Sequence, residues 1–299
     1  MRRVFKSAFR IFTAPIRGLV WLIRHLVQII IRPFKKIRSF FADTTQISDN
    51  SIGDAIGTVI EHPGSLVPHL NSLRKHIFRS VISIFLFTFL AFIFIQPILN
   101  FLAYPLPGGI DVLTAIDITE NMGAVMKVSL LSGFAVSIPY IAFEIWLFFA
   151  PGIAPRSRLY GLLAIPLALL FFLAGMAFAY YIMLPAAIPF LFNFMGLTTQ
   201  PRPSSYFNFI TAILFWIGIF FEFPLVAYVL ARLGILRAET LRAQWRLAII
   251  LIAVLSAAVT PTVDPVNMAL VMTPMFFLYL VAILLVSVAQ KKRQKHTEE

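Results

Sequence analysis

Long, continuously apolar stretches recur along most of the chain, and they restrict it to one kind of fold. From about residue 77 onward, runs of roughly 18 or more mostly apolar residues alternate with short polar segments. A helix of that length crosses the ~30 Å hydrocarbon core of a bilayer, whereas the strands of a membrane barrel are short and alternate in polarity. Charged residues make up 13% of the chain, well below the ~25% of soluble proteins. The sequence therefore predicts an all-α, polytopic membrane protein.

The charges in the loops predict the orientation of the spans. We expect six spans, at about residues 77–99, 124–149, 162–184, 207–230, 247–259 and 268–289. Lys and Arg gather before the first span, in the second and fourth loops and after the last span, while the other loops hold one base, Arg202. Because basic residues collect on the cytoplasmic side of a membrane, both termini are predicted to lie in the cytoplasm.

The composition divides the chain into four segments. Residues 1–42 are basic and amphipathic and are expected to lie in the membrane interface, where anionic lipids would bind them. A spanning alternative for residues 18–32 stays open, although Arg24 and His25 at its middle favour the interface. Residues 43–65 form a polar linker, residues 66–290 the membrane domain and residues 291–299 a cytoplasmic tail.

Several classes of function are not supported by the sequence. The net charge of +12 comes from bases at the ends of apolar runs, which is not the solvated basic face of a nucleic-acid-binding protein. The chain has no cysteine, and its five histidines form no metal-binding motif. No nucleotide-binding loop or hydrolase motif occurs. We therefore expect no enzymatic activity, metal, cofactor or nucleic-acid partner.

Glu222 is an ionisable residue within the fourth predicted span. A charge at the centre of a bilayer costs at least ~2.5–3.5 kcal/mol, so such residues usually serve a function. One interpretation is a protonated carboxyl that donates a hydrogen bond to a neighbouring helix or to the carbonyl of Phe220. That carbonyl has no partner within the helix, because Pro224 has no N–H group to donate to it. The other is a polar notch that accepts a group from a partner. Asp264, in the last outer loop, is interpreted either as a cap of the turn or as a functional residue.

Five ordered motifs between Leu66 and Ala289 resemble those of the TatC family, the core subunit of the twin-arginine protein translocase. HLNSLRKHIF resembles the motif that opens the family's first span, and WLFFAPGIAPRSR the motif that closes its second. FFLAGMAFAYYIMLP, FFEFP and TPTVDP are similar to motifs of the third span, the fourth span and the last outer loop. The first 65 residues lie outside the resemblance.

The resemblance implies six spans in a concave bundle, in a multi-pass protein of a prokaryotic plasma membrane. It implies that the protein binds signal peptides with paired arginines, joins single-span TatA- or TatB-type partners in homo- or hetero-oligomers, and uses the proton-motive force. Glu222 would contact a partner helix within the membrane. Roles in signal-peptide binding would fall to His69, Ser72, Leu73, Arg74, Phe148 and Ser157, and structural or functional roles in loops to Pro105, Glu120, Pro151 and Asp264.

Four positions depart from the family pattern. Ser72 and Ser157 stand where family members usually carry glutamate, and Met268 and Leu280 where many carry glutamine and glutamate. A serine cannot form the bidentate, charge-assisted pair that suits a guanidinium group. Three interpretations stay open. In a working TatC, Glu61, Glu144, backbone carbonyls or lipid headgroups would replace the carboxylates. In a scaffolding paralogue, arginine recognition would be lost. A small-molecule permease would need a second polar residue or broken helix within the membrane, opposite Glu222.

Overall fold

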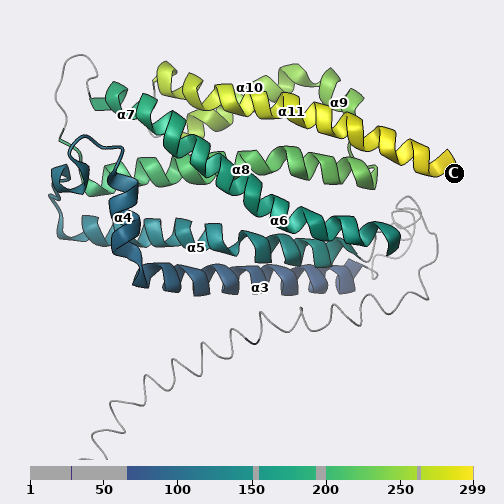
Figure 1. Cartoon of the computed structure of the whole chain (residues 1–299), viewed down its shortest axis with the longest axis horizontal. Helices are drawn as coiled ribbons and strands as arrows, with labels where there is room; N and C mark the ends of the chain where they lie inside the picture. The colour runs from purple at the N-terminus through teal and green to yellow at the C-terminus, as the bar shows by residue number, and fades with distance from the viewer. Residues whose placement is uncertain (1–27, 29–65, 151–154, 193–199, 261–263, 299) are drawn as a thin grey trace, which may run out of the picture.

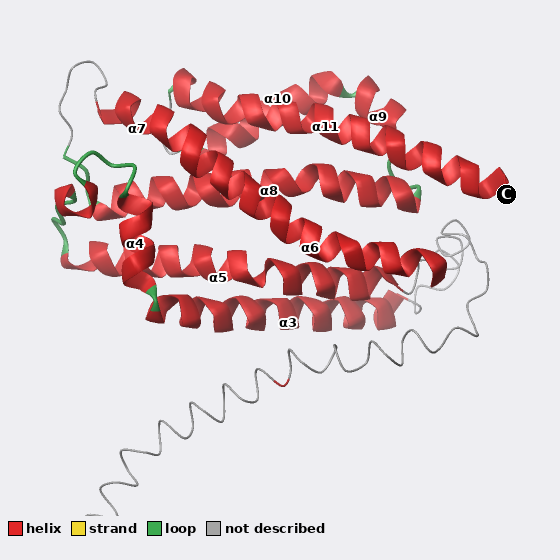
Figure 2. Cartoon of the chain, in the orientation of Figure 1, coloured by secondary structure: helices red, strands yellow, loops and turns green. Residues whose placement is uncertain are grey.

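The computed structural model describes residues 28, 66–150, 155–192, 200–260 and 264–298, and within these ranges it describes the backbone alone at 66–69, 155–160, 233 and 292–298. The predicted interfacial segment 1–42 and linker 43–65 lie outside the described residues, apart from residue 28. All regular elements in the described part are helical (Figures 1 and 2). They are α3 (Leu66–Ile93), α4 (Ile95–Ala103), η2 (Gly109–Val112), α5 (Ile118–Phe149), α6 (Pro155–Phe178), the π-turn η4 (Ala179–Met183), α7 (Leu184–Phe192), α8 (Pro203–Leu233), α9 (Ala238–Ala243), α10 (Trp245–Val259) and α11 (Pro265–Glu298).

The helices form the predicted polytopic bundle. Five of them are long and apolar enough to cross a membrane, namely α3, α5, the continuous unit α6–η4–α7, α8 and α11. The sixth span, α10, has 15 residues, which at ~1.5 Å per residue gives about 22 Å, less than the ~30 Å of an average hydrocarbon core. The start of α3 and the ends of α5, α8 and α11 lie at one end of the bundle (Figure 1), as expected for termini on the same side.

The predicted first span, residues 77–99, is wrong at its end. Its helix, α3, begins at Leu66 and ends at Ile93, and the chain then turns at Phe94 into α4. Figure 1 shows α4 lying across the end of the bundle. Pro97 explains the break, because a proline ring clashes with the carbonyl four residues earlier in a continuous helix, and here that carbonyl belongs to Ile93.

Two tyrosines hold the end of α4 against the bundle. The last carbonyls of a helix have few partners within the helix. The hydroxyl of Tyr180 in η4 donates to the carbonyl of Phe101 at 2.6 Å, and its ring stacks on Phe101 at 4.5 Å. The hydroxyl of Tyr206 in α8 donates to the carbonyl of Leu102 at 3.0 Å. The crossing helix is therefore tied to the third and fourth spans.

Glycines bring helices into backbone contact. A Cβ at Gly133 of α5 would lie 2.4 Å from the backbone nitrogen of Thr88 in α3, so the two helices approach closely there. A Cβ at Gly175 of α6 would lie 2.9 Å from the Cα of Gly218 in α8. Association of helices in lipid depends on such close packing, since burying apolar side chains there gains little over lipid contact.

We expect Gly133→Ala to weaken the contact between α3 and α5, because its methyl group would overlap the backbone of Thr88. Overpacking of this kind costs about 1–3 kcal/mol. Gly123→Ala on the same helix is the matched control, since nothing lies within 4 Å of its Cβ position. The measurement is the thermal unfolding midpoint in detergent. Equal midpoints for the two variants would contradict this packing.

Candidate functional site

The cytoplasmic end of α3 and α5 carries most of the residues predicted to bind a signal peptide. These two helices pack side by side along their length (Figure 1). Ser72 and Leu73 on α3 are half-buried, Arg74 is exposed, and Phe148 is half-buried on the last turn of α5. Pro151 lies outside the described residues, as do the side chains of His69 and Ser157.

A buried carboxylate joins the two helices at this end. Glu144 of α5 is fully buried, and its Oε2 lies 2.5 Å from Nδ1 of His76 on α3. The hydroxyl of Tyr140, one turn earlier on α5, donates to Oε1 at 2.6 Å. A nitrogen of the Arg79 guanidinium lies 3.7 Å from Oε2. Both carboxylate oxygens are therefore occupied, as a buried charge requires.

His76 connects this cluster to the predicted binding surface. Its ring meets the ring of Phe148 edge-on, with centroids 6.1 Å apart and an interplanar angle of 69°. Ser72 lies one turn before His76 on the same face of α3. The histidine thus contacts Glu144 in the interior and Phe148 toward the cytoplasm, which couples the position of Phe148 to the ion pair.

Most of this cluster was not predicted from the sequence, where His76, Arg79 and Tyr140 were not candidate site residues. Glu144 was considered as a replacement acceptor for arginine, but in the structure its carboxylate is already bound by two close donors and lies near a guanidinium. The sequence contained a usable indication. Two basic residues three positions apart, His76 and Arg79, lie on one apolar helix, and Tyr140 and Glu144, four positions apart, lie on the next.

Glu222 lies half-buried on α8, and its surroundings differ from those of Glu144. Its Oε1 is buried and has no hydrogen-bond partner in the described part of the chain. The carboxyl lies beside the backbone of Phe172 on α6. Pro224 interrupts the hydrogen-bond ladder of α8, yet Glu222 makes no described bond to the carbonyl of Phe220. The carboxyl therefore keeps a free acceptor within the membrane.

The outer loops hold the remaining predicted residues. Glu120, buried at the start of α5, pairs with Arg202 at the start of α8 and so joins the first and second outer loops.

Two aspartates cap helices at this end. Asp117 caps α5, and the hydrogen bond from the Thr119 backbone lowers the pKa of the Asp117 carboxyl below its usual value. Asp264 caps α11, with its Oδ1 accepting from the Asn267 backbone at 2.7 Å. Pro105 is half-buried in the loop after α4.

Comparisons with known proteins agree with this architecture. The family profile described as Sec-independent protein translocase protein (TatC) matches residues 68–274. TatC of Deinococcus radiodurans is 34% identical over 229 residues, which cover 74% of this chain and 84% of that protein. TatCd of Bacillus subtilis is 34% identical over 232 residues, covering 77% and 94%. The chain belongs to the TatC family.

A solved structure supports the same conclusion for the fold. The crystal structure of a twin-arginine translocase receptor, TatC, matches with a TM-score of 0.66 and 28% identity, covering 74% of this chain and 99% of that one. The protein is therefore a multi-pass membrane subunit of the Sec-independent, twin-arginine translocase. It is a transport component and not an enzyme, and these relatives give no support to the permease interpretation.

The TatC motif of the third span can be explained by packing. Phe172 is fully buried and fills the space that a side chain at Gly218 would need. Gly175 permits the close approach of α6 to α8. Phe178 packs on Phe221 with ring centroids 5.7 Å apart, and Tyr180 bonds α4 as described above. This motif builds the scaffold that holds Glu222.

We expect His76 and Glu144 to be energetically coupled in stability. A double-mutant cycle with His76→Asn and Glu144→Gln is expected to give a coupling free energy of about 0.5–3 kcal/mol, the range found for residues in contact. The measurement is thermal or denaturant unfolding of the purified TatC. Glu239→Gln is the control, because this carboxylate is exposed on α9 and such changes fall within about 0.5 kcal/mol. Additive effects of the two substitutions would show that the pair does not tie α3 to α5.

Proposed function

We propose that the cytoplasmic end of α3 and α5 binds the twin-arginine signal peptides of exported proteins. The observation that carries this proposal is the contact of His76 with both Glu144 and Phe148. It gives Phe148 a fixed support at the place where the predicted binding residues of α3 and α5 meet. Selective binding requires side chains that touch the ligand to be held in place by their neighbours.

The described side chains at this end offer hydrogen bonds and apolar contact but no free carboxylate. Ser72 presents a hydroxyl, Leu73 and Phe148 present apolar surface, and the carboxylate of Glu144 is engaged by His76 with the Arg79 guanidinium nearby. Arginine selectivity in this TatC therefore comes from acceptors beyond these residues. Glu61 of the preceding linker, which lies outside the described residues, and anionic lipid headgroups are the candidates.

Photo-crosslinking tests the binding proposal directly. With p-benzoylphenylalanine at Ser72 or Phe148, we expect crosslinks to a twin-arginine signal peptide in membranes and about tenfold fewer to a Lys-Lys version, because lysine cannot form a bidentate pair. Tyr104 is the matched control, since it is exposed at the opposite end of the bundle.

The result separates the remaining interpretations of this TatC. Arginine-selective crosslinks at positions 72 and 148, absent at position 104, support the receptor role. Equal crosslinking of both peptides, or crosslinks at position 104 alone, would contradict it and leave the role of a scaffold.

We also propose that Glu222 receives a polar group from the membrane helix of a TatA- or TatB-type partner. Its unpartnered Oε1 supports this, because an unsatisfied buried acceptor costs about 1–3 kcal/mol until a donor arrives. Apolar side chains on the same helix, Trp216, Phe223 and Val226, are exposed and suit contact with another helix or with lipid. We propose further that residues 1–42 bind anionic lipids and so anchor the assembly at the membrane surface.

We expect Glu222→Leu to lose association with a single-span partner while the fold keeps its stability, because the substitution removes an unsatisfied acceptor. Glu222→Gln retains an acceptor oxygen and is expected to keep association. The measurements are co-purification of the partner, export of a reporter and the thermal midpoint of each variant. Val226→Leu on the same helix is the control. A loss of stability in Glu222→Leu with association intact would assign Glu222 a structural role instead.

A further inference from the structure

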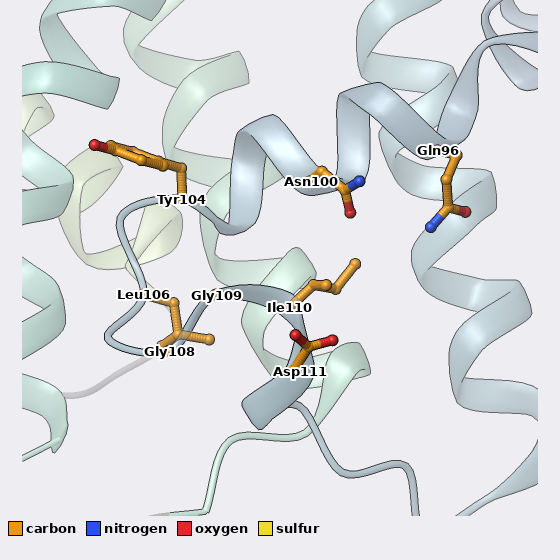
Figure 3. A pocket seen from close by; sticks show the side chains of 8 residues that line it. All are labelled: Gln96, Asn100, Tyr104, Leu106, Gly108, Gly109, Ile110 and Asp111. Atoms are coloured by element: carbon orange, nitrogen blue, oxygen red, sulfur yellow. The ribbon is translucent and has the colours of Figure 1, made fainter.

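A hollow of about 620 Å³ lies at the outer end of the bundle, between α4 and the loop that follows it (Figure 3). Gln96 and Asn100, four residues apart, line one side from the same face of α4. Asp111 in η2 lines the other side. Figure 3 shows both amides and the carboxylate turned toward the space between α4 and η2.

The loop that lines the hollow contains two glycines in the left-handed region. Gly108 and Gly109 adopt φ values of +94° and +67° in succession, which glycine tolerates and other residues rarely adopt. A Cβ at Gly108 would lie 2.2 Å from Cγ2 of Val112, so the turn is too tight for a side chain. Leu106 is buried and anchors the loop to the core. The hollow is thus a built feature of the fold.

The polar groups around the hollow are exposed and are not engaged by the protein. The side chains of Gln96, Asn100 and Asp111 make no hydrogen bond to any residue in the described ranges. Arg202, the one basic residue of the described outer loops, pairs with Glu120. The site therefore offers one uncompensated carboxylate, which suits an N–H-bearing cation, and two amides, which donate to an anion.

An apolar rim adjoins this polar hollow. Ile93 and Phe94 at the α3–α4 turn, and Phe101 and Tyr104 on and after α4, are all more than half exposed. Aromatic side chains gather at the level of lipid headgroups, and these four lie next to the hollow along the chain. A ligand here would meet charge and amides with one part and apolar surface with another.

We propose that the hollow binds a phospholipid whose headgroup carries a primary ammonium, such as phosphatidylethanolamine. The ammonium donates to the carboxylate of Asp111, the phosphate accepts from the amides of Gln96 and Asn100, and the acyl chains lie over the rim at Phe101. The volume falls within the ~300–1,000 Å³ typical of ligand pockets. A choline headgroup has equal charge but no N–H donor, so it cannot form the bond to Asp111.

Native mass spectrometry of the purified full chain tests this proposal. The protein is released from nanodiscs that contain equal amounts of phosphatidylethanolamine and phosphatidylcholine, and the retained lipids are counted. We expect about a tenfold preference for phosphatidylethanolamine, because one charge-assisted hydrogen bond distinguishes the two. Asp111→Asn and Asn100→Leu are each expected to abolish most of the preference. Glu239→Gln, which removes a carboxylate on α9, is the matched control and is expected to keep it.

Each outcome bears on the proposal. Loss of the preference in both hollow variants, with thermal midpoints unchanged, supports it. Equal retention of both lipids by the unaltered protein would overturn it, as would a preference that survives in Asp111→Asn and Asn100→Leu. A competition arm adds soluble phosphoethanolamine at millimolar concentration. Failure of the soluble head to displace the lipid supports a lipid ligand, whereas full displacement would overturn the role of the apolar rim.

Discussion

The absence of water between the helices is the constraint on which the structure depends. Inside a bilayer every polar group must find a partner in the protein, and apolar side chains alone give helices little reason to associate. This TatC meets both demands at the same contacts. Gly133 brings the backbones of α3 and α5 together, and at the cytoplasmic end of the same contact His76 and Tyr140 bind Glu144. At the outer end of the bundle, Tyr180 and Tyr206 donate to the carbonyls of Phe101 and Leu102 at the end of α4.

The one carboxylate of the described bundle that joins α3 and α5 at the cytoplasmic end is already engaged. Glu144 is bound by His76 and lies near Arg79. A buried group of this kind is a poor direct ligand, because a guanidinium would first have to displace partners already in place. Its described role is to hold His76, whose ring contacts Phe148. On the proposed signal-peptide role, the negative charge that paired arginines require would therefore come from groups other than Glu144.

Hydropathy and loop charge predicted the all-α class, the number of spans and their orientation, because each depends on local composition. The end of the first span was wrong because the apolar run continues past Pro97, although the proline ends the helix at Ile93. The spacing of His76, Arg79, Tyr140 and Glu144 hinted at a polar cluster, but the pairing itself was not predicted, since His76 and Glu144 lie 68 residues apart in sequence and meet only through the packing of α3 on α5. Glu222 was identified from its apolar surroundings, but only the structure shows that its Oε1 lacks a partner.

Polar groups without partners are informative where they are ionisable. Three buried hydroxyls, those of Ser83, Thr88 and Ser129, also lack partners. They are neutral, and they lie on α3 (Ser83, Thr88) and α5 (Ser129), the two helices in backbone contact. Glu222 differs because its unpartnered, buried Oε1 belongs to an ionisable group. The fold satisfies Glu120, Glu144 and Asp264 internally, so the open acceptor of Glu222 indicates a surface where another molecule would supply the donor. Asp111 is exposed to solvent, and its interest comes from its place at the hollow beside α4.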